Sequence, residues 1–285
     1  MTVMVWGPVR QDIRDLLADH PDDVPAMVDR LTELQTLLDR VPPRPGGNAL
    51  ADFNGLYLRV TTNVMETLYA GGFADPAFLS RLAVEVAARY FDAIRGWNEA
   101  SASCPRVWSL LFDRIGRPDC RPLSSASAGV NAQVSFDLPF ALVTTFDHLG
   151  TDPIDDSDQH HDYLQINAIV GAAVPGLSRG YLDRWQVLVD TMTGGPHGAG
   201  PHGIGGLHCG APDGNGGPDG SGPDAAGGGA ATLRAYSRNV AWRTAQRLWA
   251  MRHDQPGTAA ERARLDGHAA SLSRLLLSPM GSFLQ

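Results

Sequence analysis

The amino-acid sequence predicts an all-α fold, a compact bundle-like set of helices in a single domain over residues 1–285. Apolar residues recur with the 3.6-residue period of an α-helix along most of the chain. Prolines and capping residues mark the ends of these stretches, and no segment alternates apolar and polar residues over the length of a strand. With 285 residues, 43% of them hydrophobic, the chain is long enough to bury a core of its own.

Nine segments carry an apolar stripe at helical spacing. They are residues 24–38, 53–68, 76–90, 105–111, 124–146, 158–173, 177–192, 233–252 and 258–276. The first ends before Pro42 and the second before Gly71, because proline and glycine are common helix stops. The third opens with Asp75 as N-cap and Pro76 in the first helical position, and the fourth opens at Pro105.

The later segments carry end signals as well. Asp158 is expected to cap the helix over 158–173, and Thr258 with Glu261 has the spacing of a capping box before the last helix. Pro139 lies inside the helix over 124–146. Its ring removes one backbone hydrogen bond and clashes with the carbonyl of Ser135, which predicts a kink there.

Residues 194–229 break this pattern, because they hold 16 of the 32 glycines and almost no large apolar side chain. Such a segment cannot offset its ordering entropy by burial, so we expect a disordered insertion loop rich in Gly, Pro and His. It contains four residues that could hold a soft metal ion, His197, His202, His208 and Cys209. Their spacing matches none of the compact zinc patterns, which favours incidental histidines.

Composition excludes several classes of function. The 23 basic residues are all arginine, so Schiff-base chemistry and lysine-based phosphate binding are excluded. A net charge of −8 argues against a nucleic-acid partner. The three cysteines form no disulfide framework. Neither a signal peptide nor a membrane span is recognisable, so we expect a cytoplasmic protein without a membrane partner.

Two polar residues precede the predicted kink. Gln133 and Asp137 are four residues apart and share a helix face next to the distorted turn. A carboxylate beside an under-bonded turn is a plausible functional group. The alternative is that Asp137 faces solvent or bonds locally to the disrupted backbone.

A second polar group occurs in the segment HHDYLQINAIV. On a helical projection His160, Tyr163 and Asn167 line one edge of the apolar stripe, and Asp162 flanks the other edge. A neutral imidazole and an ionised carboxylate are both favoured at a helix N-terminus, which suits a base and its orienting acid. The alternative is a histidine satisfied in the core or in the first helical turn.

Two further groups are candidates for substrate binding. Asp52, Asn54 and Tyr57 lie at the opening of the second helix, where Asp52 has the simpler explanation of a first-turn acid. Arg238 and Trp242 share a stripe and could hold an anionic or aromatic ligand. Packing with the arginine head reaching solvent is the simpler explanation there.

The segments ADFNGLYLRVTTNV, DPAFLSRLAVEVAARYFDA, GVNAQVSFDLPFAL and HHDYLQINAIV follow one another in this order. Together they resemble the bacterial domain-of-unknown-function family 5995, over roughly residues 50–250 without the glycine-rich loop. The resemblance implies a helical protein and no particular reaction. It also implies a polar cluster drawn from Asn131, Asp137, His160, Asp162 and Asn167.

The central motif departs from the family pattern at one position. The chain keeps Asn131, Asp137 and Pro139 but has Gln133 where the family commonly has a histidine. If the family uses that histidine as a metal ligand or base, the same chemistry is in doubt here. The Glu-x-x-His pairs of di-iron bundles, HExxH and GxSxG are absent. The acidic run from Asp152 to Asp158 lies in a proline-containing loop, which disfavours a diphosphate site.

We therefore expect an enzyme without a bound cofactor or metal that acts on a small organic molecule by general acid–base catalysis, such as a cyclase, isomerase or lyase. In this hypothesis His160 exchanges the proton, Asp162 orients it, and Asp137 is the second carboxylate. The remaining candidates bind substrate: Asn131, Gln133, Asn167, Tyr163, Asp52, Asn54, Tyr57, Arg238 and Trp242. The alternatives are a metal-dependent hydrolase or oxygenase and a non-catalytic binding protein.

Overall fold

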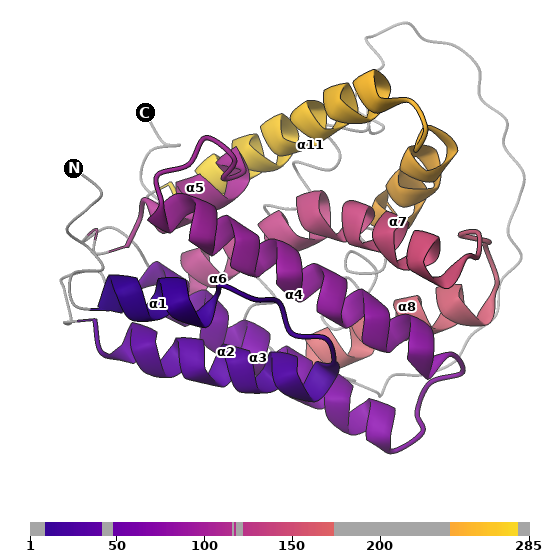
Figure 1. The fold of residues 1–285 in the computed structure, drawn as a ribbon, viewed down its shortest axis with the longest axis horizontal. Helices are drawn as coiled ribbons and strands as arrows, with labels where there is room; N and C mark the ends of the chain where they lie inside the picture. The colour runs from indigo at the N-terminus through magenta and orange to yellow at the C-terminus, as the bar shows by residue number, and fades with distance from the viewer. Residues whose placement is uncertain (1–8, 42–47, 116, 118–121, 174–239, 279–285) are drawn as a thin grey trace, which may run out of the picture.

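A computed structural model describes residues 9–41, 48–115, 117, 122–173 and 240–278 (Figure 1). All regular structure in these ranges is helical, which confirms the all-α prediction. The elements in chain order are α1 (Arg10–Leu16), α2 (Val24–Asp39), α3 (Ala49–Tyr69), α4 (Pro76–Asn98), α5 (Arg106–Phe112), α6 (Pro122–Ala132), a π-helical turn (Gln133–Asp137), α7 (Leu138–Leu149), α8 (Asp158–Ala173), the helical residues 240–250 and α11 (Gln255–Leu276). None of the described helices is both long and apolar enough to cross a membrane. The predicted helix over 177–192 and the glycine-rich segment 194–229 lie outside the described residues.

Side-chain caps fix where several helices begin. The Asp75 carboxylate accepts from the backbone N–H of Phe78 at 2.9 Å, as the sequence predicts for α4. At α11 the prediction is wrong, because Asp254 is the N-cap and accepts from the N–H of Gly257 at 3.2 Å. Thr258 therefore lies within the first turn and does not open the helix. Asp254, followed by glutamine and proline, outcompetes the capping box that begins four residues later at Thr258.

The short helix α1 has no counterpart in the sequence prediction. Ile13 and Leu17 are fully buried in it and just after it, four residues apart on one face. Two such residues are too few to define a helical period. The segment is stable because it packs on the other helices and not because of its own propensity.

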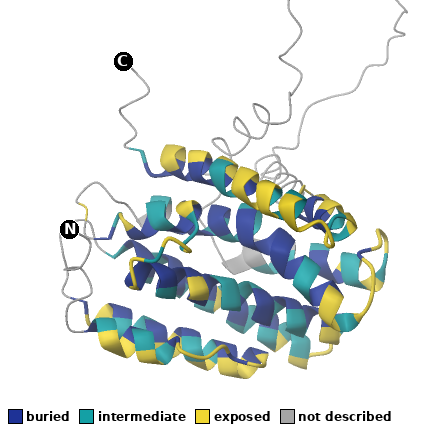
Figure 2. Ribbon diagram, turned by 45° about the horizontal axis from the view of Figure 1, so that its top comes forward, coloured by how far each residue is buried: buried dark blue, intermediate teal, exposed yellow. Residues whose placement is uncertain are grey.

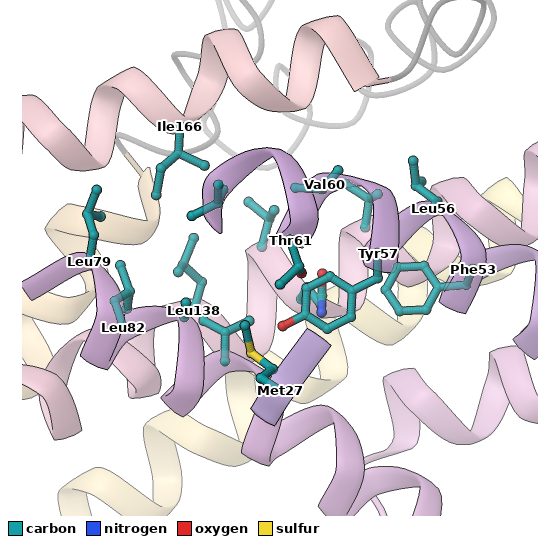
Figure 3. Close-up of a pocket in the computed structure, with 16 residues that line it drawn as sticks. Met27, Phe53, Leu56, Tyr57, Val60, Thr61, Leu79, Leu82, Leu138 and Ile166 are labelled. Atoms are coloured by element: carbon teal, nitrogen blue, oxygen red, sulfur yellow. The ribbon is translucent and has the colours of Figure 1, made fainter. Parts of the chain in front are cut away.

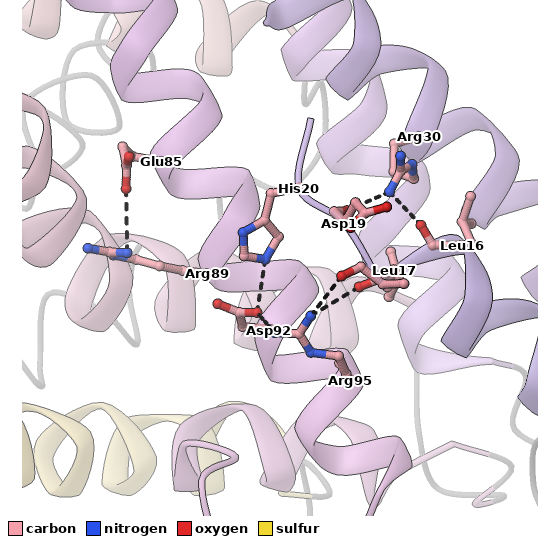
Figure 4. Close-up of polar contacts among 10 residues, drawn as sticks. Leu16, Leu17, Asp19, His20, Arg30, Glu85, Arg89, Asp92 and Arg95 are labelled. Atoms are coloured by element: carbon pink, nitrogen blue, oxygen red, sulfur yellow. Dashed lines mark hydrogen bonds and ion pairs between the residues drawn. The ribbon is translucent and has the colours of Figure 1, made fainter. Parts of the chain in front are cut away.

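Arginines from two other helices hold the loop that follows α1. The Arg30 Nη1 of α2 donates to the carbonyls of Leu16 at 2.5 Å and Asp19 at 2.6 Å. The Arg95 Nη1 of α4 donates to the carbonyl of Leu17 at 3.3 Å (Figure 4). Backbone carbonyls that lack partners at the helix end are thereby satisfied, and α1 is attached to both neighbouring helices.

The helix α4 crosses the middle of the described structure (Figure 1). It packs most extensively on α7 and also touches α1, α2, α3, α5 and α8. On each helix the buried residues face the interior and the exposed residues lie on the outer surface, as the apolar stripes require (Figure 2). Opposite faces of α4 therefore pack against other helices. Its N-terminal half and its C-terminal half lie in different parts of the core.

The buried apolar residues form two clusters. The larger cluster joins α1, α2, α3, α5, α6, α11 and the C-terminal half of α4, with Tyr90 and Trp108 fully buried in it. The smaller cluster joins the N-terminal half of α4, α7, α8 and residues 241–245, around Phe146 and Trp242. Half-buried side chains such as Val86 pack against both clusters. The clusters therefore meet along α4.

The predicted distortion before Pro139 takes the form of the π-helical turn Gln133–Asp137. Pro139 has no N–H to give and its ring crowds the carbonyl of Ser135, so the preceding turn widens. Residues 122–149 are consequently divided into α6 and α7, with Pro139 in the first turn of α7. Phe136 and Asp137 are both buried in the widened turn.

Candidate functional site

A cavity lies where the two clusters meet. The space inside it measures about 110 Å³, and it is partly open to solvent. Its wall includes Phe53 and Tyr57 of the larger cluster and Leu79, Leu82 and Leu138 of the smaller cluster (Figure 3). Because α3, α4, the π-helical turn and α8 all contribute lining side chains, the cavity depends on the tertiary packing of distant segments.

The cavity is apolar and uncharged. Among the described residues that line it, only Tyr57, Thr61 and Gln133 carry a side-chain oxygen or nitrogen, and none of the three is charged at neutral pH. The hydroxyl of Tyr57 points toward the middle of the cavity in Figure 3. A lining of this kind is typical of pockets for small organic molecules, in which a few polar groups fix the orientation of an apolar ligand.

Tyr57 and Gln133 form the polar corner of the cavity. Burial, and after it the nearby charge of Asp137, raises the pKa of the Tyr57 hydroxyl far above its usual value, although the Gln133 amide beside it lowers the pKa. Tyr57 therefore keeps its proton. The Nε2 atom of Gln133 is buried and has no hydrogen-bond partner of ordinary length among the described residues, although the Gln133 amide lies close enough to the Tyr57 hydroxyl to lower its pKa.

Asp137 lies behind this corner at the end of the π-helical turn. It is 2% exposed, and its Oδ2 accepts from the indole Nε1 of Trp108 at 2.8 Å. It does not line the cavity, whereas Gln133 and its chain neighbour Leu138 do. Burial raises the pKa of Asp137 to about 7, against the opposing effects of the Trp108 hydrogen bond and two arginines. The alternative in which Asp137 faces solvent is therefore wrong, and this carboxyl gains or loses its proton near neutral pH.

The two arginines near Asp137 are held by other groups. Arg89 donates to the carbonyl of Phe140 at 2.9 Å and to the hydroxyl of Thr144 at 2.7 Å, and it lies 3.7 Å from a carboxylate oxygen of Glu85 (Figure 4). The guanidinium of Arg262 lies 5.1 Å from the ring centre of Phe140. Neither arginine lines the cavity, so their charges act on Asp137 through the protein and not on a molecule in direct contact.

His160 lies at the start of α8, away from the cavity lining. Its Nδ1 accepts from the backbone N–H of Asp156 at 3.1 Å, which leaves the ring proton on Nε2. The imidazole stacks on Trp242 with 4.6 Å between ring centres. Partial burial lowers the pKa of His160, although the carboxylates of Asp155 and Asp156 oppose this. His160 is therefore neutral at pH 7, half-buried and packed against an aromatic ring.

Asp162 serves the start of α4. It is 3% exposed and accepts from the backbone N–H groups of Ala74 at 2.9 Å and Asp75 at 2.6 Å. Among the described residues the structure does not join Asp162 to His160 by a hydrogen bond. Residues two apart on a helix point in different directions, so Asp162 reaches the α3–α4 loop while His160 reaches Trp242.

Two predicted substrate-binding amides connect helices instead. Asn131 donates to the carbonyl of Ala269 at 2.8 Å and to the hydroxyl of Ser273 at 3.0 Å, which ties α6 to α11. Asn54 donates to the carbonyl of Leu31 at 3.1 Å and accepts from the hydroxyl of Tyr90 at 3.2 Å. Both asparagines are fully buried, and their bonds lead away from the cavity.

The other predicted substrate-binding residues either do not line the cavity or lie outside the described residues. Tyr163 is fully buried and packs on Trp242 with 5.2 Å between ring centres. Asp52 is half-buried in the first turn of α3, where burial raises its pKa. Arg238 lies outside the described residues, and so does the side chain of Asn167.

The acidic run before α8 anchors the helical residues 240–250. Asp155 accepts from the indole Nε1 of Trp242 at 2.8 Å, and Asp152 accepts from that of Trp249 at 2.8 Å. These carboxylates therefore have structural partners. Within the described residues no group of three or more His, Cys, Asp or Glu side chains is arranged to hold a metal ion, and the four metal candidates of the glycine-rich segment lie outside them.

Sequence reasoning identified the polar corner of the cavity but not the cavity itself. Gln133 and Tyr57 were both candidates, although the sequence assigned them to separate groups. Thr61 and the apolar wall were missed, because an apolar residue facing a cavity has the same sequence signal as one packed in the core. Only the position of Gln133 on an otherwise apolar face gives a local hint.

Comparison with known proteins gives one match. No curated protein and no solved structure matches the chain. The model of a family of unknown function, DUF5995, matches residues 24–198, which include α2 through α8 and thus the cavity. This confirms the resemblance drawn from the four sequence motifs, and the chain belongs to the DUF5995 family.

Proposed function

We propose that the protein binds a small, largely apolar organic molecule in the cavity between the two clusters. The observation that carries the proposal is this partly open cavity, whose described lining is apolar and uncharged. Its space of about 110 Å³ is of the same order as the roughly 150 Å³ apolar cavity that holds benzene in an engineered protein. Protein interiors are otherwise packed without large voids, so an apolar hollow between two well-packed clusters favours an occupant.

A second candidate function is supported by Asp137. Acid–base catalysis at neutral pH is most effective with a group whose pKa is near the working pH, and burial brings the pKa of Asp137 to about 7. In this candidate the bound molecule is a substrate that Tyr57 and Gln133 hold. Asp137 lies behind these two residues and does not line the cavity, so it exchanges a proton with the substrate by way of the Tyr57 hydroxyl. This is the cofactor-independent enzyme expected from the sequence, with Asp137 in the role that the sequence assigned to His160.

The binding proposal is tested by filling the cavity. Ala83 lines it from α4, whereas Ala88 lies on the same helix, is equally half-buried and does not line it. We expect the neutral probe N-phenyl-1-naphthylamine to bind the wild type with a saturable rise in fluorescence. Ala83→Phe should weaken binding at least about tenfold, since the ring occupies the space, and Ala88→Phe should leave it unchanged.

Circular dichroism and thermal unfolding would verify that both variants fold. A wild type that does not bind the probe, or an Ala83→Phe variant that binds it as well as wild type, would contradict the binding proposal. Catalysis is tested separately with a panel of neutral substrates. Turnover that Asp137→Asn abolishes while probe binding persists would support the enzyme, and turnover that survives this substitution would exclude Asp137 as the proton-exchanging group.

A further inference from the structure

The unpartnered amide of Gln133 distinguishes one corner of the cavity from the rest. Buried donors in native proteins nearly always have a hydrogen-bond partner, so a buried donor without one requires an explanation. The other buried nitrogens without partners in the described residues are the Nε atoms of Arg14, Arg81 and Arg89. Each of those guanidinium groups is bonded through another nitrogen, and none lines the cavity. Gln133 is the unpartnered donor in the cavity wall.

The groups around Gln133 define what would complement it. Tyr57 beside it retains its hydroxyl proton, so the corner offers two protons to a bound molecule. No described lining side chain carries a positive charge, and the Asp137 carboxyl lies behind the same corner. A bound anion would thus lose its hydration without gaining a counter-charge. The best complement is a neutral hydrogen-bond acceptor.

The rest of the cavity is suited to an apolar body. Leu79, Leu82 and Ile166 lie at one end, and Phe53 lies at the other, with Tyr57 between them (Figure 3). These aliphatic and aromatic side chains provide apolar contact and no further donor. A molecule that fills the cavity therefore has a hydrocarbon framework and one acceptor placed where the Tyr57–Gln133 corner is.

We propose that the cavity selects a neutral apolar molecule that carries a carbonyl oxygen, and that the Nε2 of Gln133 donates a hydrogen bond to this oxygen. The inference rests on the proposed binding function and narrows it to a ligand class, namely ketones, esters and related neutral carbonyl compounds. Gln133 thereby acts as the residue that determines specificity, while the apolar wall supplies contact area.

The test uses two molecules of almost the same shape. 2-Acetylnaphthalene has a carbonyl where 2-ethylnaphthalene has a methylene, and each is titrated against bound N-phenyl-1-naphthylamine. The ratio of the two affinities is measured in wild type and in Gln133→Leu. We expect the ratio to shift against the ketone by about tenfold in the variant, because only the ketone loses a hydrogen bond.

Controls keep the result specific. Gln165→Leu makes the same replacement at an exposed position of α8 outside the cavity, and it should leave the ratio as in wild type. Gln133→Met serves as a second variant if Gln133→Leu does not fold. The anion 2-naphthoate should displace the probe most weakly of all.

The outcomes separate the two proposals. An affinity ratio that is the same in wild type and in Gln133→Leu would overturn the inference about the carbonyl while leaving the binding function intact. Tighter binding of 2-naphthoate than of the ketone would overturn the requirement for a neutral molecule. A wild type that fails to bind the naphthylamine probe at all would contradict the binding function itself.

Discussion

Asp137 and Asp162 are buried to almost the same degree, at 2% and 3% exposure, but their surroundings differ. Asp162 accepts two backbone N–H groups at the start of α4, where the helix also favours negative charge. Asp137 accepts one indole N–H at the end of a widened helical turn. Burial alone therefore does not indicate a functional carboxylate. The number and kind of donors that compensate the burial distinguish these two carboxylates.

The same contrast applies to the regions around the two carboxylates. At the start of α8, His160 stacks on Trp242 and Asp155 accepts a hydrogen bond from the Trp242 indole, which leaves no evident role for a ligand. Where the two clusters meet, the buried Nε2 donor of Gln133 has no partner among the described residues, and it lies beside the open cavity. One region holds segments of the chain together, and the other has unused binding capacity.

The largest expected effect concerns the pH dependence of stability at Asp137. Its pKa is about 7 in the folded protein and 3.8 as the reference value, so the unfolded chain loses this proton first as pH rises. The free energy of unfolding should therefore fall between about pH 4 and pH 7, by roughly 4 kcal/mol in total, and this loss should level off above pH 7. Asp137→Asn removes this titration, so the free energy of unfolding of the variant should rise relative to that of wild type as pH increases over this range.

Urea unfolding of both proteins at several pH values from 4.5 to 8.5 would measure this difference. Asp113→Asn is the matched control, since Asp113 also accepts from an indole, that of Trp97, but lies at the surface. If the free energies of unfolding of wild type and Asp137→Asn changed in parallel with pH, the predicted titration of Asp137 would be refuted. The proposed difference between Asp137 and Asp162 would then be refuted as well.

The second effect tests the structural carboxylate. Asp162→Ala leaves the N–H groups of Ala74 and Asp75 without their buried acceptor, and we expect it to lower the free energy of unfolding at pH 7 by about 3 kcal/mol. Asp158→Ala, at the exposed first residue of the same helix, should cost less than about 1 kcal/mol. Urea denaturation measures both. Equal losses for the two variants would refute the special role of Asp162.

A smaller effect is expected at the acidic run. Asp155→Ala removes the acceptor of the Trp242 indole and of the Gln246 amide, which should cost about 1–2 kcal/mol and shift the tryptophan emission. Asp155→Asn keeps an acceptor oxygen and should retain most of the stability. If alanine were as stable as asparagine here, the anchoring of residues 240–250 would depend on packing alone.

The smallest expected effect is at Gln133. Because its buried Nε2 has no partner, Gln133→Leu should leave the free energy of unfolding unchanged or raise it by about 1 kcal/mol. Asn131→Leu, two residues earlier, breaks two hydrogen bonds to α11 and should cost about 2 kcal/mol or more. Thermal unfolding of the pair compares them directly. A clear loss of stability in Gln133→Leu would mean that the amide has a structural partner after all.

Much of the helical architecture could be predicted from the sequence, because its signals are local. The limits of α8 match the predicted range 158–173, the cap at Asp75 is present, and the distortion before Pro139 occurs where the ring requires it. The predicted cap at Asp158 is wrong, because Asp158 is the first helical residue and the hydroxyl of Ser157 accepts from the backbone N–H of His160 at 3.2 Å. The position of each helix start depends on a few adjacent residues. This is why such predictions succeed even where nothing is known about the tertiary contacts.

The candidate site was only partly predictable, because its residues meet through long-range packing. The partners of Asp162 lie 87 and 88 residues away in sequence, so no local pattern identifies it as a cap for another helix. In the sequence, Asn54 and Asn131 cannot be distinguished from amides that bind a ligand. In the structure they donate hydrogen bonds to neighbouring helices. The cavity arises from an imperfect fit between two clusters, and a fit of this kind has no signature in hydrophobic periodicity.

The widened turn at Gln133–Asp137 also sets the rotational phase between α6 and α7. Each residue of an α-helix turns the side-chain direction by about 100°, so the additional residue in the turn rotates α7 by that amount relative to α6. α6 packs on α3 and α11, whereas α7 packs on α4. Deleting a single residue here would rotate the buried Ala141 and Leu142 out of the smaller cluster. This stretch is therefore expected to tolerate a change of residue type better than a change of length.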